Sequence, residues 1–341
     1  MKTILIFGAT GAIGAYTTIE LSKEYNVIAV GRRKSDNDFF KDYGIEYHSI
    51  DITQKAEFDK LPKKGIDAIV HVAGVLPARM EGYNPRLYID TDLHGTLNIL
   101  EYMAKTKIEK IIYVSNSNNS LYNLGKIPVP PDIQKTFPKN NDHSIFAICK
   151  NAAIDLIEHY HHKHGFNRFI LRLYKMYLYH PNPYFYVDGK KRMMPYRLFI
   201  EQAMQGRDIE LWGNPSIANE TIYIYDCVSV IQRALESPLP GGVYNVGGIT
   251  PISLEDRVRG IIEVFSPSNK KSNIIYYPEK PGIPEYAADI SKTRHELGYA
   301  PQWTYVKAFN DIKEKMHNNY FSKLWGTCED YIAKDTDGGA I

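Results

Sequence analysis

The chain has 341 residues, of which 44% are hydrophobic and 23% charged, and its formal net charge at pH 7 is +2. This composition is ordinary for a soluble globular protein, and a chain of this length can bury a large core without disulfides or a structural metal. The near-neutral charge excludes a broad electrostatic field for nucleic acid, and no apolar run is long enough for a signal peptide or a membrane span. We therefore expect a cytoplasmic protein that binds neither nucleic acid nor membrane.

The first half of the chain alternates short apolar, β-branched runs with longer amphipathic stretches. The predicted strands are Thr3–Phe7, Val27–Val30, Ala68–Val72, Lys110–Val114 and Arg168–Leu173. The predicted helices are Ala12–Glu24, Asp92–Thr106 and Ser144–His164. This order predicts an α/β fold, a doubly wound parallel sheet with helices on both faces.

A segment dense in tyrosine and proline, Tyr174–Tyr186, breaks this alternation and predicts a different structural region. Beyond it, Tyr223–Tyr225 and Val243–Val246 are predicted strands, and Leu254–Phe265 is a predicted helix with one apolar face. We expect residues 1–173 to form the first domain, to which residues 223–247 return. Residues 174–222 and 248–320 would form a smaller C-terminal α/β region. Residues 321–341 are a tail of weak patterning, where we expect little order.

A glycine-rich turn follows the first predicted strand and opens the first predicted helix. Its residues are Gly8, Ala9, Thr10, Gly11, Ala12, Ile13 and Gly14. Glycines permit a tight turn, let backbone N–H groups approach a pyrophosphate at the helix N-terminus, and let the helix pack closely on the strand. The strand before the turn and the helix and strand after it predict dinucleotide binding. An ordinary strand-to-helix turn is the alternative.

The end of the second predicted strand bears on which dinucleotide binds. An enzyme that uses NAD usually has a carboxylate there to accept from the ribose hydroxyls, but this chain has Gly31, followed by Arg32 and Arg33. A small residue followed by guanidinium groups leaves room for a 2′-phosphate and can bind it. The pattern favours NADP over NAD, with a solvated basic turn as the alternative. Asp51, followed by Ile52, comes after the next predicted strand, where it can reach the adenine edge.

No residue pattern predicts a metal site. The three cysteines, Cys149, Cys227 and Cys328, are widely separated and form no CxxC pair. The histidines between positions 159 and 164 share helical faces in pairs, but no carboxylate completes a known ligand spacing. We therefore expect neither a disulfide framework nor a bound metal.

From residue 2 to about residue 315 the chain resembles the extended short-chain dehydrogenase/reductase superfamily, and in particular its nucleotide-sugar epimerases, dehydratases and reductases. Besides the glycine turn, the resemblance rests on the order and spacing of the segments 71–74, 92–101, 113–117, 171–177, 222–226, 243–247, 289–292 and 296–301. It implies a Rossmann-type fold with a smaller C-terminal substrate region, a nicotinamide cofactor and a polar substrate such as a nucleotide sugar. It also implies that Val72, Ala73, Gly74 and Ser115 line the cofactor site.

The same resemblance implies a homodimer formed through two helices of each subunit. Leu97 and Leu100 lie on one of these predicted helices, and Leu156 and Ile157 lie on the other. Composition alone does not indicate an oligomer.

The catalytic pair of the superfamily is Tyr-x-x-x-Lys, but this chain has Phe146 and Lys150. Positions four apart share a helical face, so Lys150 can lie beside residue 146, and the resemblance implies that it binds the nicotinamide ribose. The resemblance also implies that Ser117 polarises the reacting oxygen. Phe146 has no proton to give, and the loss of a positioned acid or base costs about 10²–10⁴-fold in rate.

Three explanations of Phe146 stay open. Another side chain can supply the proton, and the candidates are Tyr122, Tyr177, Cys149 and His143. The protein can instead bind its cofactor without redox chemistry, as a regulatory protein on the same fold. Phe146 can also be an engineered replacement of a natural tyrosine.

Other positions of the implied substrate site also depart from the superfamily pattern. Lys175 stands where asparagine is expected, and Asn219 and Lys280 stand where arginines are expected. A neutral Asn219 supplies no charge for a diphosphate, and a lysine cannot make the bidentate contact of an arginine. With Tyr177, these residues are the candidate substrate-binding set. Because several positions depart together, natural divergence is favoured over engineering.

Overall fold

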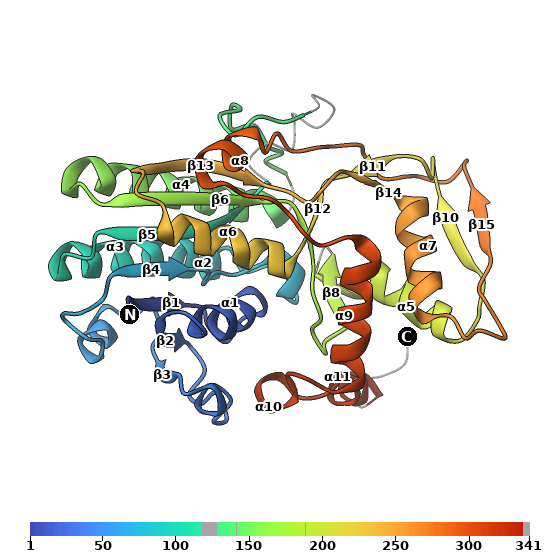
Figure 1. Ribbon diagram of the computed structural model, residues 1–341, viewed down its shortest axis with the longest axis horizontal. Helices are drawn as coiled ribbons and strands as arrows, with labels where there is room; N and C mark the ends of the chain where they lie inside the picture. The colour runs from blue at the N-terminus through green and yellow to red at the C-terminus, as the bar shows by residue number, and fades with distance from the viewer. Residues whose placement is uncertain (118–127, 141, 188, 337–341) are drawn as a thin grey trace.

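The computed structural model describes residues 1–117, 128–140, 142–187 and 189–336. Its centre is a parallel sheet of seven strands in the order β13-β6-β5-β4-β1-β2-β3 (Figure 1). The strands are β1 (Thr3–Phe7), β2 (Asn26–Gly31), β3 (Glu46–Ser49), β4 (Ala68–His71), β5 (Lys110–Asn116), β6 (Asn167–Leu173) and β13 (Gly241–Val246). The protein therefore has the predicted Rossmann-type doubly wound sheet, whose strand order reverses between β1 and β4.

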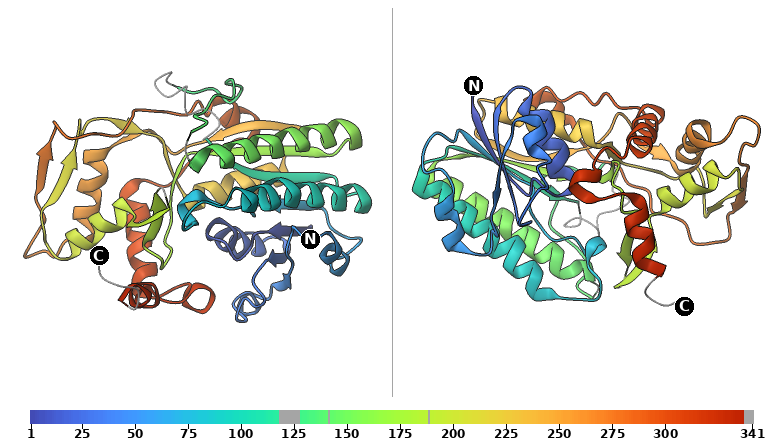
Figure 2. Two further views of the ribbon diagram at one scale, coloured as in Figure 1. Left: turned by 180° about the vertical axis from the view of Figure 1, so that it is seen from behind. Right: turned by 90° about the horizontal axis from the view of Figure 1, so that it is seen from below.

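The strands are apolar because helices cover both faces of the sheet. On one face, Ile4 and Ile6 of β1 contribute to a core with α1 (Ala12–Ser22) and α6 (Ile224–Glu236). On the other face, Leu5 and Phe7 belong to a core with α3 (Gly95–Thr106) and α4 (Asp142–His164). Figure 2 shows α3 and α4 lying side by side on this second face. Alternate residues of one strand thus serve two cores.

A second lobe carries four two-stranded sheets and three longer helices. Its strand pairs are β7 (Lys175–Tyr177) with β12 (Thr221–Tyr223), β8 (Tyr184–Val187) with β9 (Lys190–Met193), β10 (Ile209–Trp212) with β15 (Ile274–Tyr277), and β11 (Ala218–Asn219) with β14 (Ile252–Ser253). Its helices are α5 (Pro195–Met204), α7 (Leu254–Phe265) and α9 (Tyr305–His317). A further helix, α8 (Ser291–Leu297), lies beside β13.

The remaining elements are short. They are α2 (Pro85–Tyr88), α10 (Ser322–Trp325), α11 (Cys328–Thr336), 3₁₀ turns at Phe40–Tyr43, Lys55–Lys60 and Pro77–Arg79, and a π-helical stretch at Ile89–His94. None of the helices in the described part of the chain combines the length and the apolarity that a membrane crossing requires.

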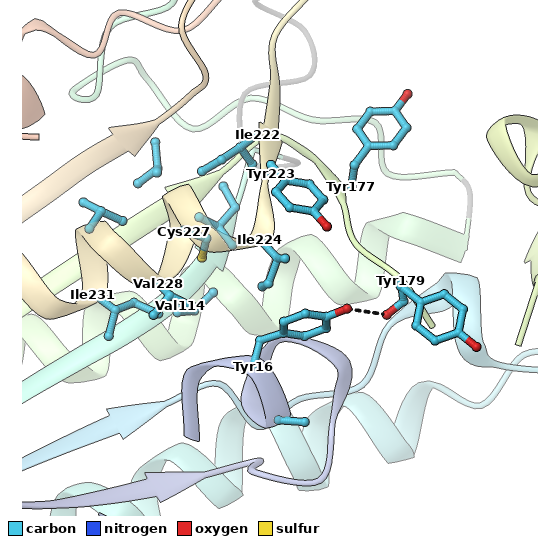
Figure 3. Close-up of a cluster of buried hydrophobic side chains, with 14 of the residues drawn as sticks. Tyr16, Val114, Tyr177, Tyr179, Ile222, Tyr223, Ile224, Cys227, Val228 and Ile231 are labelled. Carbon is cyan, nitrogen blue, oxygen red and sulfur yellow. Dashed lines mark hydrogen bonds between the residues drawn. The ribbon is translucent and has the colours of Figure 1, made fainter. Parts of the chain in front are cut away.

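A buried seam joins the second lobe to the sheet (Figure 3). The phenol of Tyr16, on α1, donates to the carbonyl of Tyr179 at 3.0 Å, and both residues are almost completely buried. Apolar side chains of α6, among them Ile224 and Cys227, lie in the same cluster. One hydrophobic core therefore extends from the first sheet into the second lobe.

Two expectations from the sequence are wrong in detail. The strand predicted at Tyr223–Tyr225 ends at Tyr223, because Ile224 begins the strongly amphipathic helix α6. Leu100 lies on α3 and Ile157 on α4, as expected, but both side chains are fully buried within the subunit. The tail is helical at α10 and α11, where tertiary contacts replace the missing local pattern.

Candidate active site

A cavity of about 310 Å³ opens at the carboxyl ends of β1, β2 and β4, where the strand order reverses. Ligands of open parallel sheets bind at this position. The lining residues are Gly8, Thr10, Gly11, Val30, Gly31, Arg32, Arg33, Ile50, Asp51, Ile52, Val72, Ala73, Gly74, Val75 and Thr91. The structure thus brings the glycine turn, the basic turn and the ends of two further strands, β3 and β4, together around one space.

The glycine turn has the shape that a pyrophosphate needs. Gly8 has a φ of +91°, and a Cβ added there would lie 2.6 Å from the backbone nitrogen of Ala73. A Cβ on Gly14 would lie 2.0 Å from the carbonyl oxygen of Gly8. Helix α1 begins at Ala12, followed by Ile13, and no side chain caps it at Gly11. Its first N–H groups are therefore left for a ligand at the positive helix end, so the residues present fit a dinucleotide phosphate.

The end of β2 is crowded at Gly31. A Cβ there would lie 2.7 Å from the hydroxyl oxygen of Thr10 and 3.0 Å from that of Tyr47, which leaves no room for a carboxylate side chain without rearrangement. Arg33 donates from Nη1 to the carbonyl of Leu324 at 2.5 Å. Arg32 is exposed, and within the described chain no hydrogen bond or ion pair engages it. Of the two arginines, Arg32 is therefore the one whose guanidinium makes no hydrogen bond within the described chain and is available to a ligand.

Beside this cavity lies a buried ion pair between Lys150 of α4 and Asp92 of the π-helical stretch. The Lys150 Nζ atom is 3.1 Å from Asp92 Oδ1, and the two side chains are 8% and 0% exposed. A Cβ on Gly74 would lie 2.5 Å from Asp92 Oδ1 and 2.8 Å from Lys150 Nζ. The ion pair therefore lies directly against Gly74, which lines the cavity.

Two more polar residues lie in the interior around Lys150. Its Nζ atom is 5.1 Å from the ring centre of Tyr113 on β5, and the Tyr113 ring is 5.1 Å from that of His71 on β4. Burial, reinforced by the charge of Lys150, lowers the pKa of His71 to about 3. Burial opposes the charge of Lys150, but Asp92 and Tyr113 outweigh it and raise the pKa of the ammonium above its usual value. The site therefore holds a charged ammonium, paired with the Asp92 carboxylate, beside a neutral imidazole.

Sequence reasoning gave no role to Tyr113 or His71. The signal that could have found them is a polar side chain inside an otherwise apolar predicted strand. Their proximity depends on the parallel register of β4 and β5, which pairs the two residues directly.

Phe146 lies next to Lys150, as the four-residue spacing predicts, but in apolar surroundings. The Lys150 Nζ atom is 5.9 Å from the centre of the Phe146 ring, which is 2% exposed. Phe146 packs with Met80, Tyr88 and Cys149. Burial raises the pKa of the Cys149 thiol to about 11, so this thiol stays protonated at neutral pH. Phe146 therefore belongs to a small, buried hydrophobic cluster.

The remaining candidate catalytic and cofactor-binding residues differ in how far they are buried and in where they lie. Ser115 is buried on β5, and Ser117 is half-buried just beyond the end of that strand. Tyr122 lies outside the described residues. Tyr177 packs on Tyr196, Tyr305 and Phe309 in the second lobe, and in the described structure no ring contact or hydrogen bond joins it to Lys150.

Three of the four predicted substrate-binding residues come together in the second lobe. Lys175 Nζ lies 5.7 Å from the Tyr177 ring, and Asn219 accepts a hydrogen bond from Nη2 of Arg257 on α7. Burial raises the pKa of Tyr177, but the charges of Lys175 and Arg257 outweigh it, and the net pKa is lowered. Arg257 was missed because no local motif surrounds it, and its partner lies 38 residues away.

The fourth predicted residue, Lys280, has other partners. Its Nζ atom is 3.3 Å from Glu210 and lies 4.4 Å and 3.9 Å from the rings of Trp212 and Tyr277. These contacts place Lys280 beside the β10 and β15 pair. Asn219 has different partners: besides its bond to Arg257, it donates to the carbonyl of Pro284.

The model of the NAD-dependent epimerase/dehydratase family matches residues 4–247. An uncharacterised protein of Methanocaldococcus jannaschii is 28% identical over 89% of this chain and 92% of its own length. UDP-glucuronate 4-epimerase 4 of Arabidopsis thaliana is 26% identical over 88% of this chain and 71% of its own length. The crystal structure of UDP-glucuronic acid 4-epimerase from Bacillus cereus in complex with NAD superposes with a TM-score of 0.70 at 21% identity, covering 92% of this chain and 99% of that one. The chain belongs to the NAD-dependent epimerase/dehydratase family.

Proposed function

We propose that this protein is an enzyme that acts on a nucleotide sugar, or a related polar carbonyl or alcohol, with a bound nicotinamide cofactor. The observation that carries the proposal is the cavity at the glycine turn, with Lys150 buried directly against its lining residue Gly74. The Arabidopsis and Bacillus relatives, named for activity on UDP-glucuronate, support a nucleotide sugar as substrate. UDP-glucuronate is accordingly the first substrate to test.

The residues that line the cavity and its surroundings suit different roles in binding and catalysis. The glycine turn and the first turn of α1 would hold the cofactor phosphates, and Asp51 and Ile52 would flank its adenine. The cofactor, when bound, supplies a hydride acceptor and donor. Lys150 would hold the ribose hydroxyls through its ammonium, and Ser117 would donate to the reacting oxygen of the substrate. Phe146 contributes packing but no proton.

NADP is the cofactor that the site favours over NAD. Gly31 leaves no carboxylate to repel a 2′-phosphate, and Arg32 lines the cavity with an uncommitted guanidinium. An affinity for NADH equal to or better than that for NADPH, measured by fluorescence titration, contradicts this preference.

A redox-inactive cofactor-binding protein is the second candidate, and the buried, hydrophobic surroundings of Phe146 favour it. Assay of the protein and of Phe146→Tyr on UDP-glucuronate, UDP-glucose and UDP-N-acetylglucosamine separates the two. The enzyme proposal expects turnover by the unmodified chain, with Phe146→Tyr faster by up to about 10²–10⁴-fold if the phenol reaches the substrate. Phe146→Leu is the matched control, because it changes the side chain without adding a phenol.

Turnover by Phe146→Tyr alone supports the redox-inactive protein. Activity in both forms directs the search to Tyr122, Tyr177 and Cys149. A chain that binds neither NADH nor NADPH contradicts both candidates.

A homodimer through α3 and α4 is part of the proposal. Leu97 and Leu156 are only partly buried on these helices, and Ile148 of α4 is 46% exposed. Sedimentation equilibrium of the protein and of Ile148→Glu tests it. A monomeric unmodified protein contradicts the dimer.

A further inference from the structure

The C-terminal segment, residues 321–336, returns to the glycine turn at the start of the chain. The indole Nε1 of Trp325 donates to the carbonyl of Thr10 at 2.9 Å, across 315 residues of sequence. The neighbouring carbonyl of Leu324 accepts from Arg33. Thr10 and Arg33 both line the cofactor cavity. Two hydrogen bonds, each from a side chain to a backbone carbonyl, therefore connect this segment to residues of the cavity wall.

The segment is firmly attached to the first domain. Phe321 is fully buried, and its ring centre is 4.7 Å from that of Tyr16 on α1. Lys323 forms an ion pair with Asp42 at 2.6 Å, and its carbonyl accepts from the side chain of Asn37 at 3.0 Å. These contacts fix the segment beside α1, which begins at the glycine turn, and beside the stretch between β2 and β3.

The same segment also contacts the second lobe. The Trp325 ring stacks on His180 of the second lobe, with ring centres 4.4 Å apart. Within the segment, Tyr331 donates to the Trp325 carbonyl at 2.8 Å. Cys328 Sγ is 3.7 Å from Nη2 of Arg197, a buried residue of α5. Trp325 therefore lies where the glycine turn, the C-terminal segment and the second lobe meet, and Figure 1 shows α10 and α11 between the two parts of the molecule.

We infer that Trp325 is a positioning residue of the cofactor site. By holding the Thr10 carbonyl, its indole N–H fixes the peptide that precedes Gly11, and so aligns the N–H groups that receive the cofactor phosphates. A turn that is already held in its binding conformation loses less entropy when the ligand binds, and this raises affinity. The inference rests on the cofactor site of the proposed function, and it assigns a cofactor role to a segment outside the family match.

The test is the affinity of Trp325→Phe for NADPH and NADH, measured by calorimetry. Phenylalanine keeps a ring against His180 and Phe321 but removes the N–H donor. One hydrogen bond of this kind changes an equilibrium about three- to tenfold, so the dissociation constant of the tighter-binding cofactor is expected to rise by that factor. Trp212→Phe is the matched control, because it removes an indole hydrogen bond to Glu210 on β10, at the other end of the molecule.

A purely structural role of Trp325 predicts a lower melting temperature of the cofactor-free protein with unchanged cofactor affinity. That result overturns the inference, as does an equal loss of affinity in Trp212→Phe. Hydrogen exchange of the unmodified protein gives a second measurement that no folding defect can obscure. Amides of residues 322–336 are expected to exchange more slowly with NADPH bound, and unchanged exchange contradicts the inference. If no nicotinamide cofactor binds at all, the proposed function fails first.

Discussion

Lys150 is a charged side chain that is almost completely buried. A buried ammonium is tolerated only when a partner offsets its loss of hydration, and Asp92 is the carboxylate within ion-pair distance. The direct ion pair therefore gives Lys150 a fixed charge and position without help from residue 146, which has no hydroxyl here.

Asp92→Ala is expected to destabilise the protein by about 3–5 kcal/mol, because it leaves the Lys150 ammonium buried and unpaired. Asp92→Asn keeps the volume and one acceptor oxygen, and a smaller loss is expected. Urea unfolding followed by circular dichroism measures both. Equal stability of Asp92→Ala and the unmodified protein contradicts a buried, charged Lys150.

At the scale of single elements, the turn between β1 and α1 shows how local sequence and tertiary contact combine. The glycines can be recognised in the sequence as a motif. Glycine is required at these positions because neighbouring atoms lie too close to leave room for a Cβ. Gly14 faces the carbonyl of Gly8, whereas Gly260 in the middle of α7 has no atom closer than 3.9 Å to its hypothetical Cβ. A side chain at Gly14 would therefore force the backbone to shift, whereas a side chain at Gly260 would fit.

Gly14→Ala is expected to destabilise the protein by about 1–3 kcal/mol through overpacking against backbone, and to abolish measurable cofactor binding because the turn must move. Gly260→Ala is the control, and its higher helix propensity predicts a gain of up to about 1 kcal/mol. Thermal melting and NADPH titration of the two variants check the contrast. A Gly14→Ala protein that binds NADPH normally contradicts the close packing described here.

At the scale of the whole molecule, the two lobes share one core. Tyr16 belongs to α1, yet its phenol bonds to Tyr179, and its ring contacts Tyr225 of α6 and Phe321 of the C-terminal segment. Such a continuous core makes independent unfolding of the lobes costly, because each would expose apolar surface that the other now covers.

Denaturant unfolding is therefore expected to be a single transition, with coincident curves from far-ultraviolet circular dichroism and from tryptophan fluorescence. Tyr16→Phe removes the hydrogen bond across the seam and is expected to lower the stability by about 1 kcal/mol in both signals. Separate transitions for the two signals would show that the lobes unfold independently.

Local patterns were sufficient for the elements whose stability depends mainly on their own residues. Leu254–Phe265 forms a helix with the predicted bounds, since its apolar positions repeat on one face and Ser253 caps it. Tyr223–Tyr225 was misassigned because a short aromatic run does not distinguish a strand from the first turn of a helix. The tail at residues 321–336 has little pattern of its own, and its helices depend on contacts with distant segments.

The amino-acid sequence by itself determined the doubly wound fold, the glycine turn and the pairing of Phe146 with Lys150, because each is encoded by neighbours in the chain. Only the tertiary structure decided that Asp92 neutralises Lys150, that Arg257 contacts Asn219, and that Trp325 holds Thr10. These contacts join residues far apart in sequence, and their energies depend on burial and distance. A residue's burial is set by the packing of the whole chain, so no local pattern could have specified it.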